Sequence, residues 1–162
     1  MGDKLERVVG VGEYIISNQP EDILKIYGLA SCIGMVLYCP KLGVLALAHI
    51  LLPSSDINPD LGKISPAYFV DTGVDALLDK LWQEYRCTKN NTIASIYGGS
   101  QARMEKDVFN IGQRNVVAAK QKLGEYGMKI CDSDTGGRVS RTLEIKVGTG
   151  KALLKMQNHC NI

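Results

Sequence analysis

The chain has 162 residues, of which 45% are hydrophobic, and it carries a formal net charge of +2. This length and composition predict one compact domain over residues 1–162, with a flexible tail after about residue 156. The basic residues are scattered, which argues against nucleic acid as a partner. No apolar run reaches 18 residues and no signal peptide is apparent, so we expect a cytoplasmic protein without direct membrane insertion.

Cysteine and histidine limit the possible chemistry. The five cysteines are odd in number and widely spaced, and the only histidines are His49 and His159. None of them forms a CxxC pair or a zinc-ligand pattern, so we expect reduced thiols, no metal site and no cofactor. His159 and Cys160 fall in the expected tail and are predicted to be inert.

The first predicted elements are short strands. Residues 7–11 and 13–17 flank Gly12, which predicts a bend between two strands. A loop rich in turn-forming residues follows, and residues 23–27 form a third strand.

A β-hairpin is predicted next. The apolar runs 33–38 and 44–52 are joined by a turn at residues 39–42. A turn centred between Pro40 and Lys41 makes the numbers of paired residues sum to 81, as 32 and 49 do. Cys32 and His49 would then be direct cross-strand partners, with Cβ atoms roughly 4.5–5.5 Å apart.

The rest of the chain alternates loops, helices and strands. Residues 53–63 are expected to form a mobile loop, and Ser65 to cap a helix that has Pro66 at its first position. A second helix is expected from Asn110 to a closing Gly127, with Gln113 as capping-box partner. The remaining expectations are strands at residues 92–97, 128–131, 142–147 and 151–156, with a tight polar turn at 132–137 and turns at both Gly-Gly pairs.

The predicted fold is an α+β domain with packed antiparallel β-sheets in a β-sandwich-like core and two main helices beside it. Short connections favour antiparallel pairing. Both arms of the hairpin are apolar on both faces, which indicates a sheet that is covered on each side.

A thiol next to an imidazole is a candidate nucleophile with its base. The histidine stabilises the thiolate and can protonate a leaving amine, which suits attack on an amide or ester. The alternative is that Cys32 is a small buried hydrophobic residue, and spacing alone favours that alternative.

The chain also resembles a known family, the chemoreceptor glutamine deamidases called CheD. The likeness lies in GLASC (28–32), AHILLP (48–53), VGEY (11–14), DTGV (71–74), YGG (97–99), NIGQRN (110–115), DTGGRVSR (134–141) and TGK (149–151). Each motif is weak by itself, but the ordered set covers almost the whole chain.

The resemblance implies a chemotaxis protein that hydrolyses selected glutamine side chains on the cytoplasmic helices of chemoreceptors to glutamate. It assigns Cys32 as nucleophile and His49 as general base and acid. We expect backbone N–H groups near Ser31 and Cys32 to hold the developing oxyanion. It implies a fold similar to the catalytic domains of deamidating cytotoxic necrotising toxins. It also implies a CheC-type phosphatase as partner, at receptor arrays. We expect the loop at residues 54–63 and the turn at residues 136–141 to form contact surfaces for the receptor.

Two positions depart from the family pattern. Ile26 stands where the family has a threonine as third catalytic member, and Ala30 replaces a glycine. Isoleucine has no side-chain hydrogen bond to offer the imidazole. This favours, as an alternative, a weakly catalytic or non-catalytic adaptor that binds receptors and the CheC-type partner. A third hypothesis is a thiol hydrolase that acts on other amides or on free glutamine.

Overall fold

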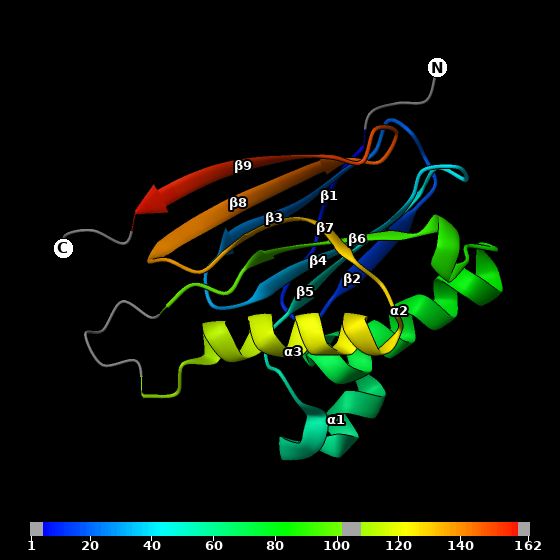
Figure 1. Ribbon diagram of the computed structural model, residues 1–162. Coiled ribbons are helices and arrows are strands. Elements are labelled where there is room, and N and C mark those ends of the chain that lie inside the picture. The colour runs from blue at the N-terminus through cyan, green and yellow to red at the C-terminus, as the bar shows by residue number, and fades with distance from the viewer. Residues whose placement is uncertain (1–4, 102–107, 159–162) are drawn as a thin grey trace.

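The computed structural model describes residues 5–101 and 108–158, which form three layers (Figure 1). The outer sheet has the strand order β1-β3-β8-β9, and the central sheet has the order β2-β5-β4-β6-β7. Helices α2 and α3 cover the other face of the central sheet. The outer-sheet strands are β1 (Glu6–Val8), β3 (Ile23–Leu29), β8 (Val139–Lys146) and β9 (Lys151–Asn158). The central-sheet strands are β2 (Tyr14–Ser17), β4 (Ile33–Cys39), β5 (Val44–Ile50), β6 (Ile93–Gly98) and β7 (Ile130–Thr135).

Strands β4 and β5 are buried on both faces because the central sheet lies between two cores. Side chains point alternately to the two faces of a strand. On β4, Met35 and Leu37 pack toward the helices, whereas Val36 packs toward the outer sheet. The doubly apolar runs in the sequence are thus explained by a sheet with helices below and a second sheet above, as expected.

The two long helices complete the lower core. Helix α2 (Val70–Glu84) buries Val74, Leu77, Leu78 and Leu81, and α3 (Ile111–Glu125) buries Ala119 and Leu123. Helix α3 ends as predicted, with Gly127 at a φ of +68°. The predicted α+β class, with two packed sheets and two main helices, is confirmed.

Of the seven strand pairs in the described residues, five are antiparallel as predicted and two are not. Strand β1 runs parallel to β3, and β7 runs parallel to β6. Both connections cross between layers. The chain leaves β1 for the central sheet before it returns in β3, and α3 links β6 to β7 across the lower face. Such crossovers produce parallel pairs.

The segment between β5 and α2 also differs from the prediction. Residues 53–63 were expected as a mobile loop, but they contain a 3₁₀ helix, η1 (Ser55–Ile57), and most of helix α1 (Pro59–Ile64). Ser65 precedes a short 3₁₀ helix, η2 (Pro66–Tyr68), without a side-chain cap, and Phe69 is the N-cap residue of α2. The Pro at position 66 does begin a helical turn, but the long helix starts four residues later because Phe69 remains extended.

The remaining elements need smaller corrections. The polar segment 132–137 is not one tight turn, because β7 continues to Thr135 before the turn at Gly136 and Gly137. A third 3₁₀ helix, η3 (Lys89–Asn91), precedes β6. Strand β9 extends to Asn158, and the expected tail at residues 159–162, with His159 and Cys160, lies outside the described residues.

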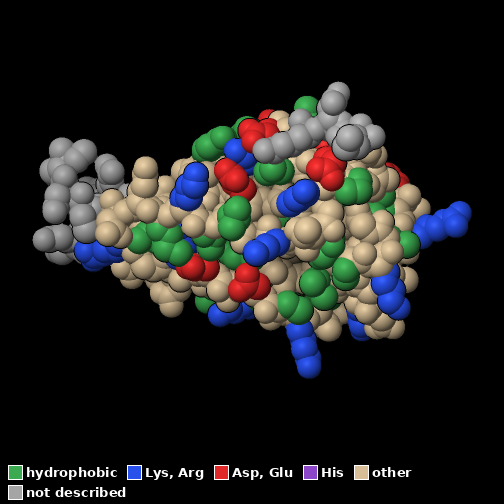
Figure 2. Space-filling model, turned by 90° about the horizontal axis from the view of Figure 1, so that it is seen from above, with side chains coloured by type: hydrophobic (Ala, Val, Ile, Leu, Met, Phe, Trp, Pro, Cys, Tyr) green, Lys and Arg blue, Asp and Glu red, His purple; other side chains and the backbone are tan. Residues whose placement is uncertain are grey.

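The outer sheet has one face toward solvent. Figure 2 shows this side, where acidic, basic and hydrophobic side chains are mixed without a large patch of one kind. Lys25 exemplifies the mixture, because its ammonium binds Glu6 at 3.3 Å and Glu144 at 3.0 Å. Among the helices within the described residues, none is long and apolar enough to span a membrane.

Candidate active site

The hairpin exists, but its predicted register is wrong. The observed pairs join Ile33 to Ile50 and Cys39 to Val44, so that paired numbers sum to 83 rather than 81. The turn spans residues 40–43, one residue later in the chain than predicted, and ends at Gly43, whose φ is +64°. His49 therefore pairs with Gly34, and Cys32 lies just before the strand begins.

Cys32 and His49 nevertheless belong to the same layer. A shift of two in the sum keeps the side-chain alternation unchanged, so Cys32 stays on the face that carries His49. Cys32 packs against the core between the sheets, which also holds the β5 neighbours of His49, Leu45 and Leu47. The relationship is diagonal rather than direct, a spacing of roughly 7–8 Å between Cα atoms in regular antiparallel strands.

The N-terminal segment anchors the histidine. The Nδ1 atom of His49 lies 3.2 Å from the carbonyl oxygen of Val9. The His49 carbonyl accepts a hydrogen bond from the Gly12 amide at 2.8 Å, and the His49 amide donates one to the Glu13 carbonyl at 3.0 Å. A carbonyl only accepts, so Nδ1 carries the proton of the neutral ring and Nε2 is the basic nitrogen. The VGEY segment thus has a specific role: it continues the β2–β5 pairing to His49 and places the Val9 carbonyl beside the imidazole.

Burial sets the charge states of both groups. Desolvation lowers the pKa of His49 from its ordinary value, although the Val9 carbonyl and the charge of Glu13 act in the opposite direction. Burial raises the pKa of the Cys32 thiol to about 11, with a smaller opposing effect from its own backbone amide. Both side chains are therefore neutral at rest near pH 7, with the proton on sulfur and a free lone pair on Nε2.

The segment that carries Cys32 is held by its carbonyl groups. Ala30 accepts a hydrogen bond from the Ser100 amide at 2.8 Å, and Cys32 accepts one from the Gly99 amide at 2.9 Å. Between them, Ser31 accepts one from the side chain of Asn115 at 2.9 Å. Three consecutive carbonyls are thus fixed by the two residues that follow β6 and by α3. The chain after β6 and the start of α3 both lie toward the left of Figure 1.

The YGG motif permits the closest of these approaches. Gly98 has a φ of +106°, and a Cβ there would lie 2.2 Å from the carbonyl oxygen of Cys32. A side chain at this position would displace the segment that carries Cys32. Both glycines of the pair have positive φ, as the sequence predicted. Ala30, by contrast, is absent from the positive-φ positions of the described chain, so its methyl group causes no backbone strain.

Ile26 lies in the core between the sheets. It is fully buried on β3, where it pairs with Leu143. Its Cδ1 lies 3.3 Å from where a Cβ on Gly34 would lie, and Gly34 is the direct partner of His49. Position 26 is therefore close to the candidate site, but it contributes a hydrocarbon surface. The hydrogen bond to the imidazole comes from the Val9 backbone instead.

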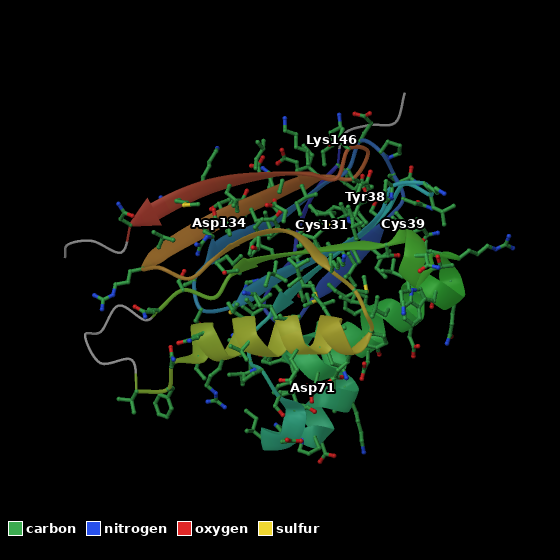
Figure 3. The ribbon with its side chains drawn as sticks, in the orientation of Figure 1. Tyr38, Cys39, Asp71, Cys131, Asp134 and Lys146 are labelled. Atoms are coloured by element: carbon green, nitrogen blue, oxygen red, sulfur yellow. The ribbon has the colours of Figure 1, made fainter. Side chains whose placement is uncertain are left out.

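A buried ionic network supports the same edge of the sheet. The Arg141 guanidinium, only 3% exposed, donates to the Ser100 hydroxyl at 2.8 Å and to the Asp134 carboxylate at 2.8 Å. Figure 3 labels Asp134 on β7, far from Tyr38 and Cys39 at the hairpin turn. Arg141 is thus a structural residue, and the expected contact surface at residues 136–141 does not include its side chain.

The other expected contact surface, residues 54–63, is ordered by Asp71. Its carboxylate, labelled at the start of α2 in Figure 3, accepts hydrogen bonds from the Ser55 amide at 3.0 Å and from the Ser55 hydroxyl at 2.8 Å. A cavity of about 820 Å³ opens beside it, between η1 and α3. Within the described residues, no three acidic, cysteine or histidine side chains are grouped to hold a metal ion.

Comparison with known proteins places the chain in a family. A family model described as CheD chemotactic sensory transduction matches residues 51–156, well over half of the chain. A protein from Thermotoga maritima, named chemoreceptor glutamine deamidase CheD, is 34% identical over 93% of this chain and 92% of its own length. The chain belongs to the CheD family.

Two further CheD relatives give similar values. One from Caldanaerobacter subterraneus is 37% identical over 98% of this chain and 97% of its own length. One from Syntrophotalea carbinolica is 34% identical over 88% and 89%. Both are named probable chemoreceptor glutamine deamidases. The stretch matched by the CheD family model begins at Leu51, after both Cys32 and His49, so their roles depend on the geometry above.

The sequence indicated Cys32, Ser31 and His49, but it missed three contributors to this site. The Val9 carbonyl, the Asn115 amide and the Ser100–Arg141 pair all come from distant parts of the chain. The available signal was that each lies inside or next to a motif of the CheD resemblance. Their contacts were not evident from those motifs.

Proposed function

We propose that this protein is a glutamine deamidase that converts glutamine side chains on the cytoplasmic helices of chemoreceptors to glutamate. The observation that carries the proposal is the shared layer of Cys32 and His49, with His49 bound to Val9 through Nδ1. This arrangement leaves Nε2 as the basic nitrogen of a ring on the same face of the sheet as the thiol. The names of the CheD relatives support the same substrate.

The reaction follows from the neutral resting state. The Cys32 sulfur attacks the carboxamide carbon, an S–C bond forms, and His49 Nε2 takes the thiol proton. His49 returns that proton to the departing nitrogen, the C–N bond breaks, and ammonia leaves a thioester. Water then attacks with His49 as base, the C–S bond breaks, and the thiol is restored. The net change is hydrolysis of one amide to one acid, without a metal or an organic cofactor.

The oxyanion is assigned to the backbone amides of Ser31 and Cys32. Within the described residues, neither amide donates to a neighbouring group apart from the contact of Cys32 with its own sulfur. The carbonyls on either side are already bound by Gly99 and Ser100. Donors that are fixed before the reaction stabilise developing charge without reorganisation.

Specificity must come from contacts beyond the glutamine side chain, which is a small group. A receptor coiled coil supplies a long helical surface for such contacts. A CheC-type phosphatase is the second partner that we propose, and it would compete for access to the same edge of the domain.

The direct test is incubation of purified receptor fragments with the protein, followed by mass spectrometry. Each conversion adds about one dalton, and ammonia is released in equal amount. Wild-type protein should convert specific glutamines, whereas Cys32→Ala and His49→Ala should not. Conversion by Cys32→Ala at the wild-type rate would refute the mechanism. Ammonia release from free glutamine at the same rate would show a general amidase instead.

Ile26 favours a second candidate, an adaptor that binds receptors and the CheC-type partner with little catalysis. Its buried hydrocarbon side chain offers the imidazole no hydrogen bond. Receptor binding without any conversion, by wild type and by Ile26→Thr, would support the adaptor over the enzyme.

A further inference from the structure

Asn115 is a fully buried polar side chain on the first half of α3. Its Nδ2 lies 2.9 Å from the carbonyl oxygen of Ser31 and 3.0 Å from that of Leu51. An amide NH₂ group has two hydrogens to donate, and both are used here. The two carbonyl acceptors also settle which end of the amide carries the nitrogen.

The two acceptors have a particular place in the chain. Ser31 directly precedes Cys32, and Leu51 follows His49 by two residues, just beyond the end of β5. One side chain therefore holds both the segment that carries the nucleophile and the segment that leaves the base. The ladder between β4 and β5 does not supply this link, because Cys32 lies before β4 begins and has no ladder partner on β5.

We propose that Asn115 is a positioning residue, which fixes the nucleophile segment relative to His49 and does not touch the substrate. The effect of Asn115 on catalysis rests on the proposed deamidase function. The claim that Asn115 fixes the position of Cys32 does not depend on that function. Loss of both hydrogen bonds would free Ser31 and Leu51, and displacements of about 1 Å can lower a rate about 100-fold.

Burial supports a role for the amide itself. The Asn115 Oδ1 is buried and has no hydrogen-bond partner among the described residues. The Asn115 side chain thus leaves its oxygen without a partner, while its NH₂ group donates one hydrogen bond to Ser31 and one to Leu51. Packing alone would be met better by an apolar side chain of similar size.

Two variants separate positioning from simple packing. Asn115→Leu keeps the same branched arrangement of heavy atoms and removes both donors. Leu123→Ala removes a fully buried side chain two turns further along the same helix, roughly 12 Å from Asn115. It serves as the control, because it disturbs the packing of α3 on the sheet but leaves both hydrogen bonds of Asn115 in place. The two proteins are compared at a temperature where urea denaturation shows each to be fully folded.

The first readout is independent of deamidation. The rate of Cys32 modification by iodoacetamide, followed by peptide mass spectrometry, should change at least threefold in Asn115→Leu and stay at the wild-type value in Leu123→Ala. Equal rates in all three proteins would overturn the proposal, even if the wild type deamidates receptors normally. A wild type that fails to deamidate would instead refute the proposed function and leave this result standing.

The second readout is steady-state kinetics on receptor fragments. Asn115→Leu should lower kcat about 10- to 100-fold with KM unchanged, because the side chain is buried away from the substrate. Leu123→Ala should retain kcat. A rise in KM with unchanged kcat in Asn115→Leu would overturn the positioning role in favour of a contribution to binding.

Discussion

The imidazole of His49 is bound through Nδ1 to the backbone carbonyl of Val9, at 3.2 Å. This contact crosses between segments 40 residues apart and fixes the tautomer of the ring. In many cysteine hydrolases a side chain orients the histidine. Here a backbone group does so, and a point mutation at Val9 cannot remove a carbonyl. The departure at Ile26 therefore leaves the base oriented.

The acid limb of the activity profile should lie lower than for an ordinary histidine. Desolvation lowers the pKa of His49 below 6.5. The neutral ring is the form that accepts the thiol proton, so activity is full above that pKa and is lost as pH falls through it. We expect kcat/KM on receptor fragments to reach half its maximum at a pH below 6.5. A midpoint above 6.5 would contradict the described environment of the ring.

The Cys32 thiol should react slowly at neutral pH and gain reactivity only in strong base. Burial raises its pKa to about 11 from an ordinary value of 9.0. Because the thiolate is the nucleophile, alkylation should increase up to about pH 11 in the folded protein. The same peptide in urea-denatured protein is the control, with a midpoint near 9.0. A folded-state midpoint below 9.0 would instead show an ion pair between Cys32 and His49 at rest.

Ile26→Thr should cost stability and restore little activity. The side chain is fully buried in the core between the sheets, where a hydroxyl has no provided partner. The matched control is Ile26→Val, which has nearly the shape of threonine and should cost about 0.5–1.5 kcal/mol. Threonine should cost about 1–3 kcal/mol more, measured by urea denaturation, because its hydroxyl is buried.

Activity then decides the importance of position 26. Since the Val9 carbonyl already binds Nδ1, the Thr and Val variants should have similar kcat values. A gain of tenfold or more in Ile26→Thr alone, about 1.4 kcal/mol in transition-state free energy, would show that the imidazole lacks a partner in this chain.

Local patterns predicted the hairpin and both long helices, because apolar periodicity and turn residues are local signals. The register failed for a local reason as well. The four-residue turn lies at 40–43, where Gly43 takes a positive φ, instead of at 39–42, so the paired sum moves from 81 to 83. Since the shift is even, the side chains kept their faces, and Cys32 and His49 remained in one layer. An odd shift would have separated them.

The supports of the site were not predictable in the same way. Asn115 lies in an amphipathic helix where the sequence indicated only a cap, and its acceptors are 84 and 64 residues away. The parallel edge strands, β1 and β7, likewise depend on which layer the chain enters next. Such contacts follow from the packing of layers, and no local propensity encodes them.

The last prediction concerns how closely α3 approaches the site. A Cβ on Gly112 would lie 2.1 Å from the carbonyl oxygen of Ser100 and 2.7 Å from the carbonyl carbon of Gly99. Both atoms belong to the backbone, so no rotamer change relieves the clash. Gly112→Ala should therefore lower the free energy of unfolding by about 3 kcal/mol, the upper part of the range for overpacking. It should also lower activity, because the Gly99 and Ser100 amides hold Cys32 and Ala30.

Gly124→Ala, on the same helix, is the matched control. A Cβ there would meet no atom within 4 Å, and the residue is not among the positive-φ glycines. Alanine has the higher helix propensity, so this change should raise stability by up to about 1 kcal/mol and leave activity unchanged. If α3 packs directly on the Gly99–Ser100 backbone, urea denaturation should show a lower free energy of unfolding for Gly112→Ala and a higher one for Gly124→Ala. Equal and small effects would mean that the start of the helix can move away from the nucleophile segment without cost.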